Sequence, residues 1–108
     1  MIYRFGTFEL DTARFELRAD GVPVPLEPQV LDLLTLLVAR AGELVTRDEI
    51  IERVWNGRFV SEAAISSRVN AVRRALGDDG RRQAMLRTVP RRGFRFVTTV
   101  DAPARAGH

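Results

Sequence analysis

Cysteine is absent from this 108-residue sequence, and its single histidine is the last residue, His108. Without a thiol the chain can form no disulfide, no zinc–thiolate site and no cysteine nucleophile. One terminal histidine likewise excludes a Ser–His–Asp triad and a multi-histidine metal site. Glycine-rich phosphate loops and zinc-binding patterns are missing too. The sequence therefore predicts neither an enzyme nor a cofactor.

Long apolar segments are also lacking. The longest apolar run, residues 33–39, is interrupted by Thr35 and falls far short of the ~20 residues that cross a bilayer. The first residues alternate polar and apolar side chains, unlike a secretory signal. With 45% apolar and 29% charged residues, the composition is that of one soluble globular domain, which we expect in the cytoplasm.

Lysine is absent as well, since all 17 basic residues are arginine, and these are unevenly distributed. Residues 1–67 carry seven arginines against eleven acidic residues, whereas residues 68–95 carry nine arginines against only Asp78 and Asp79. A formal net charge of +3 thus conceals a strongly basic final third. This polarity suits a protein that presents one face to a polyanion, and a solvated basic face without a partner is the alternative.

Residues 3–26 alternate apolar and polar side chains between turn signals, the pattern of an antiparallel meander. The predicted strands are Tyr3–Phe5, Phe8–Leu10, Arg14–Arg18 and Val22–Leu26. Asp20 and Gly21 form a favoured hairpin dipeptide. Pro23 and Pro25 cannot donate hydrogen bonds to a neighbouring strand, so the fourth strand should lie at a sheet edge.

Two helices are predicted next. The first begins at Pro28, which suits a first helical turn, and its leucine-rich stripe continues until near Gly42. Thr46 opens a capping box for a second helix of about ten residues, which the dipeptide at 56–57 ends.

A third predicted helix, residues 61–76, begins at the cap residue Ser61 and buries an aliphatic stripe. The stripe consists of Ile65, Val69, Val72 and Leu76. At about 100° per residue, the opposite side carries no acidic residue after Glu62. That side holds Ala63, Ala64, Ser67, Asn70, Ala71 and Arg74, with Arg68 on one flank and Arg73 nearer the core. Small residues let a backbone approach a DNA groove, and amide, hydroxyl and guanidinium groups can read base edges.

A basic hairpin follows the helices. Its predicted strands, 86–89 and 94–100, are joined by a turn with Arg91 and Arg92 at the tip, and Arg87 and Arg95 lie on the strands. Such a hairpin can place guanidinium groups against phosphates or in a narrow minor groove. Meander, three helices and basic hairpin, in that order, predict a winged helix-turn-helix over residues 1–100. Residues 101–108, rich in Ala, Pro and Gly, are expected to be a linker or disordered tail.

Several motifs in a fixed order match a known family. They are VPLEP at 24–28, GELVTR at 42–47, VW at 54–55, VRRALG at 72–77 and LRTVPRRGFRF at 86–96. On these motifs, residues 3–100 resemble the OmpR/PhoB-type winged-helix DNA-binding domain. The resemblance implies an α+β fold with an N-terminal four-stranded antiparallel sheet, a three-helix core and a C-terminal β-hairpin wing. It implies sequence-specific binding of double-stranded DNA within a bacterial transcriptional regulator, with recognition helix 61–76 in the major groove and the wing on the flanking minor groove.

The resemblance also suggests residue roles, read together with the helix side described above. Base reading is expected of Ala64, Ser67, Arg68, Asn70, Ala71 and Arg74. Phosphate and wing contacts are expected of Thr46, Arg47, Trp55, Arg73, Arg87, Thr88, Arg91 and Arg92. The family often has arginine where Ala71 stands, so base preference would rest on Arg68, Asn70 and Arg74.

The turn of the wing departs from the two-component members, which usually have glycine in place of Arg91 and tyrosine in place of Phe94. It is more similar to the one-component CadC/ToxR-like branch. We therefore expect the chain to be the leading domain of a longer protein, followed by a sensor or membrane domain that could anchor it, and a free-standing regulator is the alternative. The resemblance further implies a monomer in isolation, a head-to-tail tandem dimer on direct repeats, and RNA polymerase contact through loop 56–60.

Two other functions remain open from the residues alone. A winged helix can bind an acidic protein through its basic face, which salt-dependent affinity for a preferred duplex would argue against. It can also bind structured RNA, which competition between duplex DNA and RNA would detect. An enzyme is the weakest expectation, for want of a nucleophile–base pair or metal ligands.

Overall fold

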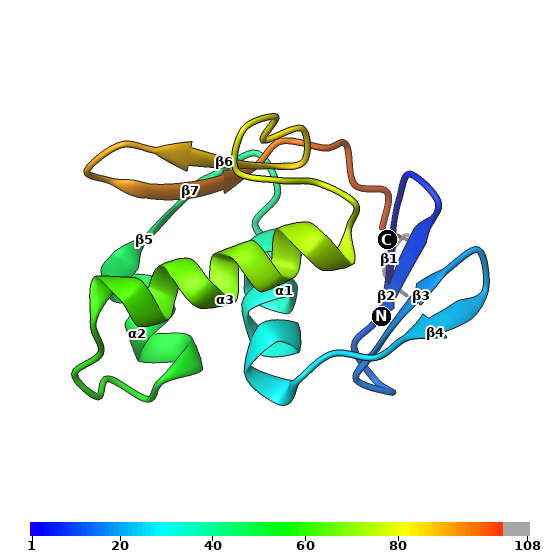
Figure 1. The fold of residues 1–108 in the computed structure, drawn as a ribbon. Helices are drawn as coiled ribbons and strands as arrows, with labels where there is room; N and C mark the ends of the chain where they lie inside the picture. Colours follow the sequence, from blue (N-terminus) through cyan, green and yellow to red (C-terminus); the bar gives the residue numbers. More distant parts are fainter. Residues whose placement is uncertain (103–108) are drawn as a thin grey trace.

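The computed structural model describes residues 1–102, which fold into seven strands and three helices (Figure 1). Four strands lead, three helices follow with one short strand between the first two, and two strands close the fold. The winged-helix architecture expected from the sequence is confirmed. None of the helices in residues 1–102 has the length and apolar character that a membrane-spanning segment needs. Residues 103–108, most of the expected linker, lie outside the described residues.

The leading strands form one antiparallel sheet in the order β1-β2-β3-β4. Their bounds are β1 Ile2–Phe5, β2 Phe8–Asp11, β3 Glu16–Ala19 and β4 Val22–Val24. Leu10 and Leu17 are neighbours across the sheet and are fully buried, so this row faces the core. Pro23 lies on the edge strand β4, as its missing N–H requires.

Two strand ends differ from prediction. β3 begins at Glu16 rather than Arg14, because Phe15 has a left-handed φ of 54° and the N–H of Arg14 donates to Asp11 Oδ1 at 3.1 Å. Both residues belong to the turn after β2. β4 ends at Val24 rather than Leu26. The residue after Val24 is Pro25, which has no N–H to donate to β3.

The three helices begin where their local signals predict. Helix α1 (Pro28–Ala39) has proline in its first turn, and seven of its residues are buried. Helix α2 (Arg47–Val54) is capped by the hydroxyl of Thr46, which accepts from Glu49 N at 3.1 Å. Helix α3 (Glu62–Ala75) is capped in the same way by Ser61, which accepts from Ala64 N at 3.1 Å.

The wing is a three-stranded sheet rather than the predicted two-stranded hairpin. Strand β5 (Leu44–Thr46) pairs with β7 (Gly93–Phe96), which pairs in turn with β6 (Leu86–Val89). Gly93 allows this pairing, since a Cβ there would lie 2.1 Å from the carbonyl oxygen of Val45. The sequence missed β5 because three residues are too few to show an alternation.

The chain after β7 returns to the first sheet. β7 ends at Phe96 rather than Val100, and Asp101 then exchanges two backbone hydrogen bonds of 2.7 Å with Arg4. Asp101 therefore contacts the first sheet through its backbone. The rings of Phe5 and Phe96, 5.2 Å apart edge to face, join the two sheets within one hydrophobic core.

Candidate nucleic-acid interface

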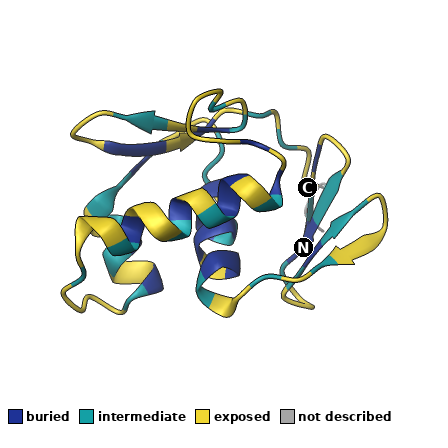
Figure 2. Cartoon of the chain, viewed as in Figure 1, coloured by how far each residue is buried: buried dark blue, intermediate teal, exposed yellow. Residues whose placement is uncertain are grey.

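α3 packs its aliphatic stripe against α1 and leaves the opposite side open to solvent (Figure 2). We define the outer face of α3 by its exposed residues after Glu62, which are Ala63, Ser66, Ser67, Asn70 and Arg74. Three of the predicted base-reading residues, Ala64, Arg68 and Ala71, are half-buried at one margin of this face. Ser66 was not among the predicted site residues, although it lies one helical turn before Asn70 and is exposed.

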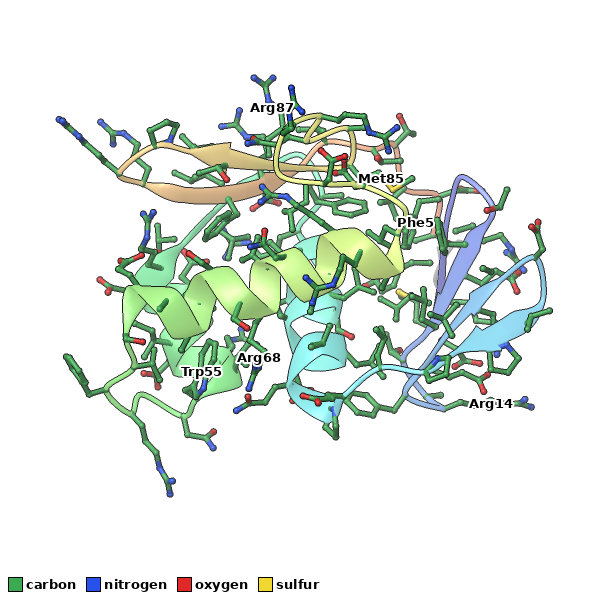
Figure 3. All side chains as sticks on the ribbon, in the orientation of Figure 1. Phe5, Arg14, Trp55, Arg68, Met85 and Arg87 are labelled. Carbon is green, nitrogen blue, oxygen red and sulfur yellow. The ribbon has the colours of Figure 1, made fainter. Side chains whose placement is uncertain are left out.

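Arg68 leaves α3 on the side away from the wing (Figure 3). Its Nε donates to Oε1 of Gln29, the second residue of α1, at 3.1 Å. A hollow between α3 and the segment that leads into α1 is lined by Ser67, Arg68, Arg74 and Glu27 among others. Gln29 carried no signal in the sequence, because a contact across 39 residues has no local pattern.

Arg73 is not available for the phosphate contact expected of it. The residue is only 5% exposed, and its guanidinium donates to the carbonyl oxygen of Leu86 at 3.1 and 2.9 Å and to the hydroxyl of Thr88 at 2.9 Å. Burial lowers the pKa of Arg73, and the nearby carboxylates of Asp78 and Asp79 oppose that shift. Arg73 therefore fastens α3 to β6, and the Thr88 hydroxyl serves the same link.

The loop between α3 and β6 is organised by a buried carboxylate. Asp78 is 6% exposed and accepts four backbone N–H groups, from Asp79, Ala84, Met85 and Leu86, at 2.8 to 3.2 Å. Burial alone would raise the pKa of Asp78, but these hydrogen bonds outweigh it and hold the pKa below its ordinary value. Asp78 therefore has a structural role, because its carboxylate holds together the loop that follows α3.

The wing turn brings two arginines beside the start of α2. Arg91, with a left-handed φ of 67°, and Arg92 are exposed, and a shallow hollow between them and α2 is lined by Thr46, Arg47 and Asp48. Arg47 is partly engaged already, since its Nε contacts Glu62 at 3.0 Å and its guanidinium lies 5.6 Å from the centre of the Phe94 ring.

The remaining residues expected to contact DNA are Arg87, Thr88 and Trp55. Arg87 and Thr88 are successive residues of a strand, so their side chains point to opposite faces, and Thr88 faces α3. Arg87 projects from the wing sheet on the side away from α3 (Figure 3). It therefore does not join the surface that the wing tip forms with α3. Trp55 is half-buried at the C-terminal end of α2, where it packs against the core.

Ion pairing divides the arginines into two groups. The N-terminal sheet pairs its arginines with carboxylates, Arg4, Arg14 and Arg18 with Glu9, Asp11 and Glu16. Between residues 68 and 95, only Arg82 contacts a carboxylate, that of Asp79 at 3.7 Å. No carboxylate of residues 1–102 lies within 4.0 Å of the remaining guanidinium groups there, those of Arg68, Arg73, Arg74, Arg81, Arg87, Arg91, Arg92 and Arg95. The structure thus leaves positive charge uncompensated around the outer face of α3 and along the wing.

Comparisons with known proteins agree with this arrangement. The family model described as "Transcriptional regulatory protein, C terminal" matches residues 21–96. The transcriptional activator CadC of Escherichia coli is 28% identical over 100 residues, which cover 92% of this chain and 20% of CadC. This chain therefore spans about a fifth of that relative.

Two solved structures are similar in fold. The DNA-binding domain of Escherichia coli CadC superposes with a TM-score of 0.77 at 27% identity, covering 93% of this chain and 94% of that chain. The RstA DNA-binding domain of Klebsiella pneumoniae, crystallised in complex with the RstA box, gives a TM-score of 0.80 at 21% identity and shows the same fold. It covers 89% of this chain and 96% of that chain. This chain therefore belongs to the family of transcriptional regulatory protein C-terminal domains, the winged helices of the OmpR/PhoB type.

Proposed function

We propose that this domain binds double-stranded DNA with sequence preference, as part of a bacterial transcriptional regulator. The outer face of α3 enters the major groove, and the wing tip lies on the flanking minor groove. Base reading is assigned to Ser67, Asn70 and Arg74 and, at the margin, to Ala64, Arg68 and Ala71. Phosphate contacts are assigned to Arg91 and Arg92 at the wing tip, to Thr46 and Arg47 at the start of α2, and to Trp55 at its end.

One observation carries this proposal: within residues 1–102 the arginines around α3 and the wing tip have no carboxylate within 4.0 Å, whereas those of the N-terminal sheet do. A surface built only for solubility would gain from compensating charges at neighbouring positions. A surface that binds a polyanion must keep its charges free, because each neutralised phosphate releases counterions and adds affinity. Small residues on α3 such as Ala63 and Ser67 also allow close approach to a groove.

The longer regulator is part of the proposal. This chain spans only 20% of CadC. We therefore propose that the full-length protein also contains a sensor or membrane domain. The winged-helix domain would then lie in the bacterial cytoplasm. Two copies bind direct repeats head to tail.

Loop 56–60 contacts RNA polymerase, and its Phe59 is 97% exposed. Phe59→Ser would then lower transcription activation and leave DNA affinity unchanged.

Selection of bound duplexes from a random oligonucleotide pool tests the function directly. The expected result is an enriched motif, repeated in direct orientation, whose affinity falls steeply as salt rises. Structured RNA should compete poorly with the enriched duplex. A pool that yields no motif, or tighter binding to RNA or to an acidic protein, would overturn the proposal.

A further inference from the structure

The side chain of Arg68 on α3 is held by a hydrogen bond to a neutral side chain of another helix, Gln29 of α1. Its Nε donates to Gln29 Oε1 across 3.1 Å, and the residue is half-buried. Arg73 is buried in its bonds to β6, while the exposed Arg74 makes no side-chain hydrogen bond within residues 1–102. Gln29 is the second residue of α1, so the hydrogen bond connects α3 to the most buried helix of the domain.

This arrangement leaves the two terminal guanidinium nitrogens of Arg68 available for a contact with DNA. The bond to Gln29 uses Nε, and neither terminal nitrogen donates to any atom of residues 1–102. Those two nitrogens form the fork that pairs with O6 and N7 of guanine. Since Gln29 is neutral and no described carboxylate lies within 4.0 Å of Arg68, no ion pair within residues 1–102 competes with a contact to DNA.

We propose that Gln29 is a positioning residue that fixes Arg68 for reading a guanine in the major groove. The inference rests on the proposed function and adds to it a residue outside the recognition helix. An arginine held in one orientation before binding loses less side-chain entropy on binding, an effect worth about two- to tenfold in affinity. The gain applies to the base contact, which needs one orientation, and much less to random DNA, where phosphates accept a guanidinium from many directions.

The test is a double-mutant cycle with a specificity readout. Affinities for the selected duplex and for a random duplex are measured for wild type, Gln29→Met, Arg68→Ala and the double variant. Gln29→Met keeps the length of the side chain and removes the acceptor, and Arg53→Ala, an exposed arginine of α2, is the control for one lost charge. Gln29→Met should lower the preference for the selected duplex about two- to tenfold, and the double variant should match Arg68→Ala.

A second variant separates positioning from packing. Gln29→Glu keeps an acceptor oxygen, so it should retain the ratio of the two affinities while lowering both through its negative charge. Additive losses in the cycle, or an unchanged ratio in Gln29→Met or in Arg68→Ala, would overturn the role of Gln29 and leave DNA binding in place. Failure of the wild type to bind duplex DNA would instead remove the proposed function, and the inference with it.

Discussion

Two charged residues, Arg73 and Asp78, are buried and yet fully partnered. Arg73 donates hydrogen bonds to Leu86 and Thr88 of β6 and, at 3.4 Å, to Asn70. Asp78 accepts four backbone N–H groups, three from the loop that leads into β6 and one from Leu86 of β6 itself. A buried charge is tolerated only when its hydrogen-bonding groups are satisfied. The two side chains therefore fix the position of the wing beside α3.

Arg73→Met should destabilise the fold because it keeps the aliphatic stem but leaves the Leu86 carbonyl without its donor. The expected loss in the free energy of unfolding is about 1–3 kcal/mol, measured by urea denaturation. The matched control is Arg74→Met on the exposed face of the same helix, which should stay within about 0.5 kcal/mol of wild type. Equal losses in the two variants would contradict the assignment of Arg73 as the link to the wing.

Asp78 should make stability depend on pH. Its pKa is lower in the folded state than in the unfolded chain, so its contribution is present above about pH 4 and is lost as the pH falls through the folded pKa. Asp78→Asn should therefore be less stable than wild type at pH 7 by about 1–3 kcal/mol, with the gap closing below about pH 4. Unfolding curves from pH 2 to pH 7 check this, with the exposed Asp32→Asn as control. A gap that does not change with pH would contradict it.

Elements with local signals could be predicted, and those made by distant partners could not. The caps at Thr46 and Ser61 and the proline start of α1 fixed the helices within a few residues. Strand β5 was missed because its three residues become a strand only by pairing with β7, about fifty residues away in sequence. On α3 the helical period placed Asn70 and Arg74 on the outer face correctly. The same reasoning could not show that β6 covers Arg73 or that Gln29 holds Arg68.

The pairing of β5 with β7 should depend on Gly93. Gly93→Ala would place a methyl group 2.1 Å from Val45 O and 2.9 Å from Thr46 Cα, so β5 and β7 must separate. The expected loss is at least about 3 kcal/mol in the free energy of unfolding. Gly21→Ala is the matched control, since its φ of +80° is also left-handed but open space surrounds it. It should cost only about 1–2 kcal/mol, and a similar cost at both sites would contradict this account.

Over the whole molecule, the ion-paired arginines and the unpaired ones within residues 1–102 are concentrated on different surfaces. The N-terminal sheet holds its arginines in ion pairs, whereas the arginines of the outer face of α3 and of the wing tip have no carboxylate of the described residues within 4.0 Å. The core connects these parts through α1 and the Phe5–Phe96 contact, so the basic surface is carried on a rigid frame. This arrangement explains how a domain of formal net charge +3 can present a strongly basic side.

The wing tip should contribute to affinity without regard to sequence. Arg91→Ala combined with Arg92→Ala should weaken binding to selected and random duplexes alike and reduce the slope of log K against log salt by about two. The matched control is Arg4→Ala combined with Arg14→Ala, which removes two charges from the N-terminal sheet and should leave the slope unchanged. An unchanged slope in the wing variant would show that the tip points away from DNA.

The most direct test of the central claim is the affinity of Arg74→Glu for the selected duplex, measured beside that of Arg53→Glu. Both arginines are exposed and unpaired within residues 1–102, but Arg74 lies on the outer face of α3 and Arg53 in the groove between α1 and α2. If α3 faces the DNA, Arg74→Glu should lose more than about tenfold in affinity and Arg53→Glu less than about threefold. Equal losses would show that DNA does not contact the outer face of α3.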